Sequence, residues 1–225
     1  MSGRRAYAER VTPSPVRLWR SERDALCDLL LEKGPDAPTL CGDWTTRDLA
    51  AHLHIRENRP DAAVGIVIGP LARWTAKVQA DAAAGDYSEL VEAVRSGPPR
   101  WSPVAIEAVD VETNTIEFFV HHEDVRRATE PWEPRALGDE EVAQLWGRAS
   151  KAGTYLLRRS PVGVLATPSD GPAAGTTVTL RKGSHAVDLR GPVGEIVLAM
   201  YGRVTKGLEI VGTDADVHAF RAYPR

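Results

Sequence analysis

The sequence predicts an α+β fold in which an N-terminal four-helix bundle is followed by a smaller C-terminal α/β domain. Apolar residues recur at helical spacing through about the first two thirds of the chain. Short segments with the alternation of strands appear only after that part. The connections between the helical segments are short to medium, which is typical of a bundle. We therefore place the bundle in residues 1–154 and the second domain in residues 155–225.

The predicted helices have clear start and stop signals. Gly34 and Pro35 stop the first helix. Thr45 and Asp48 have the spacing of a capping box, so the second helix begins there. The expected helices cover residues 15–33, 45–58, roughly 70–95 and about 111–129, with a connecting fifth at about 139–159.

The last third of the chain changes pattern. Residues 176–180 and 186–189 alternate as strands do, and residues 181–184 read as the turn between them. The remaining expected elements are a strand at 162–166, a short helix at 194–201, a strand at 208–211 and a short helix at 214–220. This mixture of short elements predicts the small α/β domain.

Composition excludes several classes of protein. The net charge of −3 argues against a nucleic-acid partner held by phosphate contacts. Cys27 and Cys41 are too few for a disulfide framework and fit a reducing compartment. No apolar run approaches the roughly 20 residues that span a bilayer, and the basic N-terminus lacks the apolar core of a secretory signal. We expect a cytoplasmic protein without a membrane partner, either a monomer or a small homo-oligomer.

Three side chains form a candidate site for a divalent metal. Glu117 and His121 are four residues apart, so a helix presents both from one face. His52 shares a stripe of the second helix with Leu49 and Leu53, while His54 points away from that stripe. Two histidines and one carboxylate suit zinc and leave a coordination position open, and the same set could hold ferrous iron or nickel.

Each of these residues also has an ordinary structural interpretation. An E-x-x-x-H pair often forms a solvated salt bridge, and His52 could be a core histidine bonded to a carbonyl. The apolar run around Glu117, with Ile116 before it and Phe118 after it, favours the metal, because a buried carboxylate needs a partner.

At these residues the chain resembles a known family. The stretch GDWTTRDLAAHL, with EFFVHHEDVRRA far downstream, is similar to the mycothiol-dependent maleylpyruvate isomerase family of actinobacteria, and most of all to its metal-binding subgroup without an assigned reaction. The resemblance implies a DinB/YfiT-like four-helix bundle and a sterol-carrier-like C-terminal domain that closes the cleft. It also implies that His52, Glu117 and His121 bind the metal, zinc in the isomerase branch, and that mycothiol is the thiol cofactor.

Residues around the three ligands have less definite roles. His122 lies about 100° round the helix from His121, so it is not expected to bind the same ion. Asp124 could support His121 or form a salt bridge with Arg127 or Arg56. Arg203 is the candidate catalytic arginine of the C-terminal domain, and Arg56, Arg59 or Arg203 could bind a carboxylate of the substrate or cofactor.

Three functions are compatible with such a site. The first is an enzyme in which a metal-bound low-molecular-weight thiol such as mycothiol attacks a small electrophilic substrate, giving isomerisation or S-transfer. The second is a non-catalytic metal- or ligand-binding protein, which a fourth protein ligand such as Cys41 or His54 would favour, although a buried filler is the more common role of a cysteine like Cys41. The third is a zinc-dependent hydrolase with Glu57 or Glu123 as base.

Overall fold

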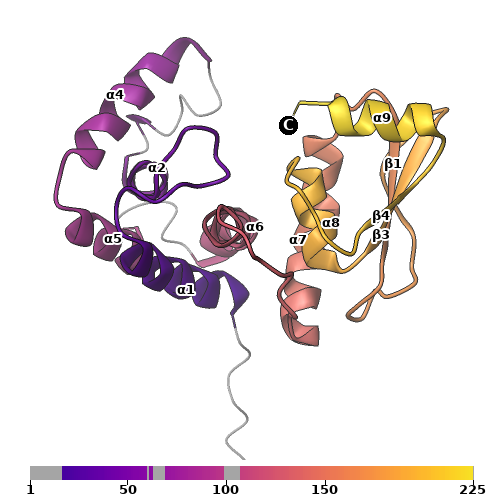
Figure 1. Ribbon diagram of the computed structural model, residues 1–225, viewed down its shortest axis with the longest axis horizontal. Coiled ribbons are helices and arrows are strands. Elements are labelled where there is room, and N and C mark those ends of the chain that lie inside the picture. The colour runs from indigo at the N-terminus through magenta and orange to yellow at the C-terminus, as the bar shows by residue number, and fades with distance from the viewer. Residues whose placement is uncertain (1–16, 60, 63–68, 99–106, 225) are drawn as a thin grey trace, which may run out of the picture.

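The structure is a computed structural model that describes residues 17–59, 61–62, 69–98 and 107–224. Its helical part is formed by α1 (Leu18–Lys33), α2 (Thr46–Asn58), η1 (Gly69–Leu71), α4 (Ala72–Ala83), α5 (Tyr87–Ser96) and α6 (Glu107–Arg126). In Figure 1, α6 is seen end-on between the other bundle helices and the C-terminal half of the chain. The α+β fold with a helical N-terminal part is confirmed.

The third helical region, predicted as one helix at residues 70–95, consists of two helices, α4 and α5. The predicted extent of this helix was therefore wrong. The chain turns at Gly85, and Asp86 caps a new helix by accepting a hydrogen bond from the Glu89 backbone N–H at 2.9 Å. A side-chain cap of this kind satisfies an orphan donor of the first helical turn. The capping box of Thr45 and Asp48 is present, which fixes the first residue of α2 and hence the angular position of each later side chain.

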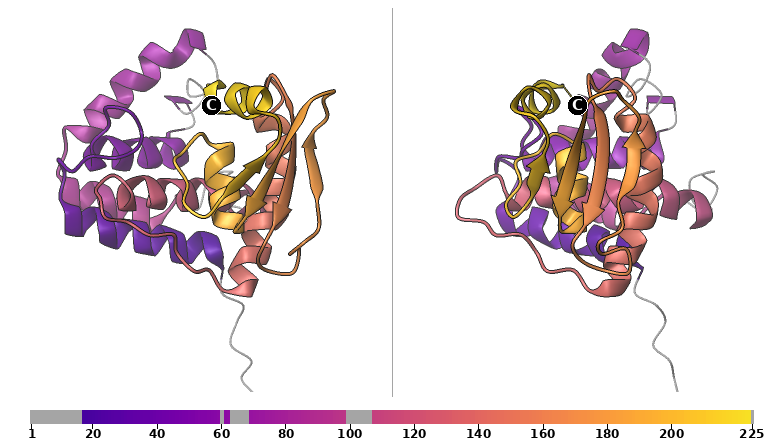
Figure 2. Two further views of the ribbon diagram at one scale, coloured as in Figure 1. Left: turned by 45° about the vertical axis from the view of Figure 1, so that its right-hand side comes forward. Right: turned by 90° about the vertical axis from the view of Figure 1, so that its right-hand side faces the viewer.

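The C-terminal part packs helices on a four-stranded sheet. Its elements are α7 (Asp139–Leu156), β1 (Gly163–Pro168), β2 (Val178–Arg181), β3 (Ala186–Gly191), α8 (Val193–Met200), β4 (Glu209–Val211) and α9 (Asp214–Ala222). Figures 1 and 2 show α7 and α8 on the side of the sheet that faces the bundle.

The expected hairpin of the second and third strands does not form. The strand order is β2-β1-β3-β4, with β1 antiparallel to β2 and parallel to β3. Val164 and Ala166 of β1 are fully buried, so β1 takes a central position. The segment after β2 therefore passes the start of β1 and pairs there, where the Gly163 N–H donates to the His185 carbonyl at 2.7 Å.

Helix α6 belongs to two apolar cores. Phe118 packs into a core with α1, α2 and α5, whereas Phe119 and Val120 join the core of α7, α8 and the sheet. Adjacent residues on a helix point about 100° apart, so one helix can bury both sides. The boundary at residues 154 and 155 stays a prediction.

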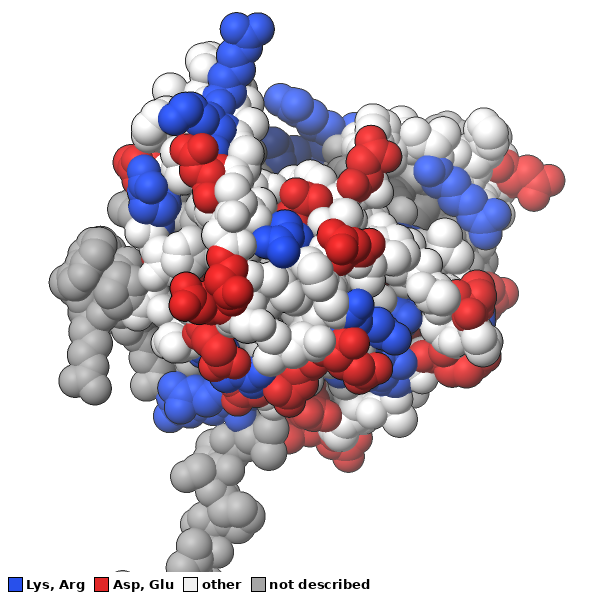
Figure 3. All heavy atoms as spheres, turned by 60° about the vertical axis from the view of Figure 1, so that its left-hand side comes forward, with Lys and Arg blue, Asp and Glu red and all other residues white. Residues whose placement is uncertain are grey.

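Figure 3 shows one face of the molecule, on which acidic and basic side chains are interspersed. None of the described helices is both long and apolar enough to cross a membrane.

Candidate metal centre

His52 enters the site from α2, three residues before Ile55 in a helix whose inner face is fully buried. Its ring packs on Trp44, with 5.0 Å between ring centroids. Trp44 lies in the loop just before α2, and its backbone N–H bonds to the Cys41 carbonyl at 3.3 Å. The loop and the helix therefore hold the imidazole between them.

Glu117 and His121 enter the site from α6. Glu117 Oε1 lies 3.4 Å from His52 Nε2 and 3.3 Å from His121 Nε2. The candidate ligand atoms of the three residues all lie within 4.8 Å of one another. The structure thus brings together the three side chains that the sequence singles out.

The open side of this triad lies at Glu117. Its side chain is 23% exposed, against 10% for His52 and 11% for His121. In the part of the chain that the structure describes, no further cysteine, histidine or carboxylate completes a four-residue group with these three.

Electrostatics support an ionised carboxylate beside a protonated imidazole. Burial opposes ionisation of Glu117, but hydrogen bonds with His121 and His52 and the charge of Arg56 hold its pKa well below the usual value. Burial likewise opposes a charge on His121, yet its bonds to Asp124, Cys41 and Glu117 raise its pKa well above the usual value.

Asp124 supports His121 from the side away from Glu117. Its Oδ2 is 3.0 Å from His121 Nδ1. Of the two roles that the sequence suggests for Asp124, the structure therefore shows support of the His121 ring. The ion pair of Asp124 is with Arg203, at 2.8 and 2.9 Å, and not with Arg127 or Arg56. Burial raises the pKa of Asp124, but the bonds from Arg203 and His121 outweigh it and lower that pKa to about 2.

Cys41 is more than a filler. Its Sγ lies 3.0 Å from Asp124 Oδ2 and 3.5 Å from His121 Nδ1, and Arg203 reaches it at 3.9 Å. Cys41, His121 and Asp124 thus form a second group of possible metal ligands, in contact with the other nitrogen of the same imidazole. Sequence reasoning gave this thiol too little weight, because only the fold brings its loop to α6.

Arg56 approaches the triad from α2. Its Nε is 3.4 Å from Glu117 Oε1, and it donates a short hydrogen bond to Asn114 Oδ1. Asn114 in turn donates to Glu57 Oε1 at 2.6 Å, and Glu57 pairs with Arg23 through two bonds of 2.6 Å. A buried chain of polar side chains therefore leads from α1 to the candidate ligand Glu117.

Several residues that the sequence suggested as parts of the site lie outside it. His122 is buried on the opposite side, 2.7 Å from Glu22 Oε2. Arg59 pairs with exposed Asp61. The carboxylates proposed as hydrolytic bases are enclosed in ion pairs, Glu57 with Arg23 and Glu123 with the three arginines at 126, 127 and 135. His54 bonds within its own helix to Asn58.

The donor set fits a divalent metal. Zinc binds imidazole nitrogen and carboxylate oxygen at about 2.0–2.2 Å, so ligand atoms of a tetrahedral site lie roughly 3.3 Å apart. The two nitrogen–oxygen separations of 3.4 and 3.3 Å agree with that spacing. Asp124 on the second nitrogen of His121 is the carboxylate support that metal-bound histidines usually have.

With this geometry in place, the chain can be compared with known proteins. The family of the mycothiol maleylpyruvate isomerase N-terminal domain matches residues 16–159, more than half of the chain. The chain belongs to this family.

Two solved structures of the mycothiol-dependent maleylpyruvate isomerase are similar to this chain, and the first of them shares its fold. One is 16% identical, with a TM-score of 0.55 and coverage of 86% of this chain and 90% of that one. A histidine-to-alanine variant of that enzyme is 14% identical, with a TM-score of 0.49 and the same coverage. The search of curated proteins found no match.

Proposed function

We propose that the chain is a metal-dependent enzyme, with zinc as the metal, that uses mycothiol or a similar low-molecular-weight thiol for isomerisation of, or S-transfer to, a small electrophilic substrate. The supporting observation is the convergence of His52, Glu117 and His121 on one partly open point. Membership of the mycothiol maleylpyruvate isomerase family favours a thiol over water as the reacting partner.

The residues around the site would have different roles in binding the metal and the thiol. Bound zinc would favour the thiolate form of a coordinated thiol. His52, Glu117 and His121 would hold the ion, and Asp124 keeps the His121 ring turned so that Nε2 faces the site. Arg203 holds Asp124 in its ionised form through two hydrogen bonds.

Arg203 and Arg56 are the candidate catalytic residues. Each guanidinium carries five N–H donors and borders a carboxylate of the site, so each can also contact a substrate oxygen. Tyr201 would contribute a neutral hydroxyl. Its pKa is raised to about 12 by burial and by the nearby charge of Glu117, so it keeps its proton at neutral pH.

Metal content and thiol transfer in two histidine variants test the proposal. His52→Ala should lose bound zinc and thiol-dependent turnover, because only two ligands remain. His54→Ala is the matched control, since His54 lies two residues on in α2 but bonds to Asn58 outside the triad. Zinc measured by mass spectrometry and mycothiol consumption with a small electrophile are the readouts.

The same assay separates the other candidate functions. An unchanged zinc content in His52→Ala would refute the ligand assignment. Zinc-dependent cleavage of an ester without any thiol would favour a hydrolase, although Glu57 and Glu123 are engaged in ion pairs. Full zinc occupancy without turnover would favour a binding protein.

A further inference from the structure

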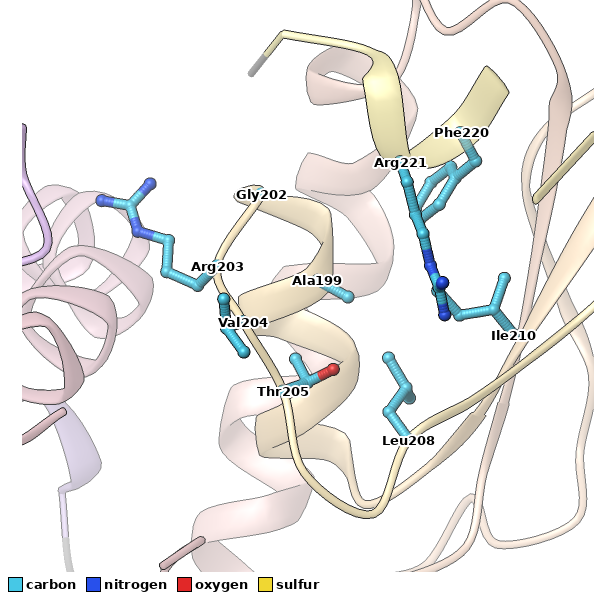
Figure 4. Close-up of a pocket in the computed structure, with 9 residues that line it drawn as sticks. All are labelled: Ala199, Gly202, Arg203, Val204, Thr205, Leu208, Ile210, Phe220 and Arg221. Atoms are coloured by element: carbon cyan, nitrogen blue, oxygen red, sulfur yellow. The ribbon is translucent and has the colours of Figure 1, made fainter. Parts of the chain in front are cut away.

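A pocket of about 290 Å³ lies in the C-terminal part, between α8, the segment 202–208 and α9 (Figure 4). Its walls combine the apolar side chains of Val204, Leu208, Ile210 and Phe220 with polar groups from Thr205 and two arginines. The volume is close to the lower end of the range of small-molecule sites, about 300–1,000 Å³. The pocket therefore suits a small ligand that carries both an apolar body and a polar group.

The charged groups at this pocket are all positive. Arg221 extends from α9 along the pocket toward Ile210, whereas the side chain of Arg203 points away toward the bundle (Figure 4). No acidic residue is among those that line the pocket. Within the described part of the chain, Arg221 has no hydrogen-bond or ion-pair partner, so its guanidinium is available to a ligand.

We infer that this pocket binds a small organic acid, whose carboxylate pairs with Arg221 and whose apolar body packs on Leu208, Ile210 and Phe220. The planar fork of a guanidinium matches a carboxylate with two parallel hydrogen bonds. The hydroxyl of Thr205, also in the lining, offers a further donor. This site goes beyond the proposed thiol chemistry, because it needs neither the metal nor the thiol.

The pocket is connected to the candidate metal centre through one segment. Gly202, Arg203 and Val204, together with Arg221, line both this pocket and a second pocket of about 450 Å³, which reaches Leu40 and Tyr201. Arg203 meanwhile holds Asp124. The acid could thus be the substrate of the metal centre or a separate effector. Its carboxylate would be recognised in the same way in both cases.

Binding of 4-methylpentanoate and its neutral amide, 4-methylpentanamide, to the zinc-loaded full chain tests the inference. Isothermal titration should show the acid binding about tenfold or more tightly than the amide, because the neutral amide forms no ion pair and offers the guanidinium one acceptor oxygen instead of two. Arg221→Gln should abolish that preference. Arg190→Gln is the control, since Arg190 is an exposed arginine of the same domain that pairs with Asp188 outside the pocket.

Equal binding of acid and amide to the wild type, or an unchanged preference in Arg221→Gln, would overturn the inference. Inhibition competitive with the electrophile would assign the site to the substrate, and binding that leaves the KM of the electrophile unchanged would assign it to an effector. Arg221-dependent binding in a protein that fails the thiol assay would support this site and count only against the proposed function.

Discussion

At the scale of single residues, the candidate site depends on an imidazole held from both sides. His121 Nε2 is 3.3 Å from Glu117 and His121 Nδ1 is 3.0 Å from Asp124. Without a metal, these contacts raise the pKa of His121 well above its usual value despite its burial. Since a metal binds only the deprotonated nitrogen, the proton and the ion compete for Nε2.

This competition predicts the pH dependence of zinc binding. The raised pKa means that His121 is protonated below it and loses the proton as pH rises through it. Zinc affinity of the wild type should therefore fall as pH decreases below this raised pKa. Asp124→Asn removes a contact that raises this pKa, so the fall should shift to lower pH. Competition with a chromophoric chelator at a series of pH values measures the zinc affinity. Identical pH profiles for the wild type and Asp124→Asn would contradict the prediction.

At the level of single residues, the sequence predicts the neighbours that helical spacing determines. It does not predict the contacts that depend on how distant segments pack. Glu117 and His121 share a helical face whatever the rest of the chain does. Cys41 reaches His121 only because the Leu40 backbone N–H bonds to the Asp124 carbonyl at 3.0 Å, a contact between distant segments. Arg203 could be proposed from the family but not paired, because its partner Asp124 lies 79 positions away in the chain.

At the scale of elements, Asn114 links α6 to α2 by hydrogen bonds. This side chain is 1% exposed and joins Glu57 and Arg56 by hydrogen bonds. Arg56 in turn lies 3.4 Å from Glu117. Asn114 is therefore placed to position a candidate metal ligand without contacting the ion.

Asn114→Ala should lower zinc affinity by about tenfold or more, the usual effect of losing support behind a metal ligand. Asn58→Ala is a control on α2, because among the described residues the Asn58 side chain bonds to His54 in its own helix turn. Zinc affinity by chelator competition and thermal melting of the metal-free protein separate the two possible roles. Reduced stability with unchanged zinc affinity would show that Asn114 serves the fold alone.

Two glycines of α7 give a matched test of packing. A Cβ on Gly153 would meet Met200 Cε at 2.8 Å and Leu180 Cδ2 at 3.2 Å, whereas a Cβ on Gly147 meets nothing within 4 Å. Gly153→Ala should gain less stability than Gly147→Ala, because its Cβ must displace the ends of the buried Met200 and Leu180 side chains. Gly147→Ala should increase the free energy of unfolding by about 0.5–1 kcal/mol, because glycine weakens a helix interior. Urea denaturation measures both variants, and an equal gain in stability for the two would contradict this account of the α7 packing.

The boundaries of helices follow from local sequence signals, whereas the pairing of strands in the sheet does not. The capping box of Thr45 and Asp48 is local and was found. The Asp86 cap is equally local, but continuing apolar spacing on both sides of Gly85 concealed it. The position of β1 between β2 and β3 was not predictable, since strand alternation says which face is buried and not which strands are neighbours.

At the scale of the whole molecule, a buried ionic network joins the helical bundle to the C-terminal part of the chain. Arg127, at the end of α6, bonds to Glu123 at 2.5 Å and to Glu195 of α8 at 2.6 and 3.1 Å. The side chains of these three residues are at most 3% exposed. Arg135 adds a bond from the following loop to Glu123 at 2.5 Å. The network fixes α8 on α6, and with it the segment that brings Arg203 to Asp124.

Arg127→Met tests whether this network holds the two parts together. Removing the cation leaves Glu195 buried without its principal partner, so the free energy of unfolding should fall by about 3–5 kcal/mol. Arg126→Met is the control, because Arg126 pairs with the same Glu123 but is 25% exposed, and its loss should cost under about 1 kcal/mol. Urea denaturation of the metal-free variants gives both values. If the two variants lost equal stability, the apolar core around Phe119 and Val120, which also crosses between the parts, would be what holds them together.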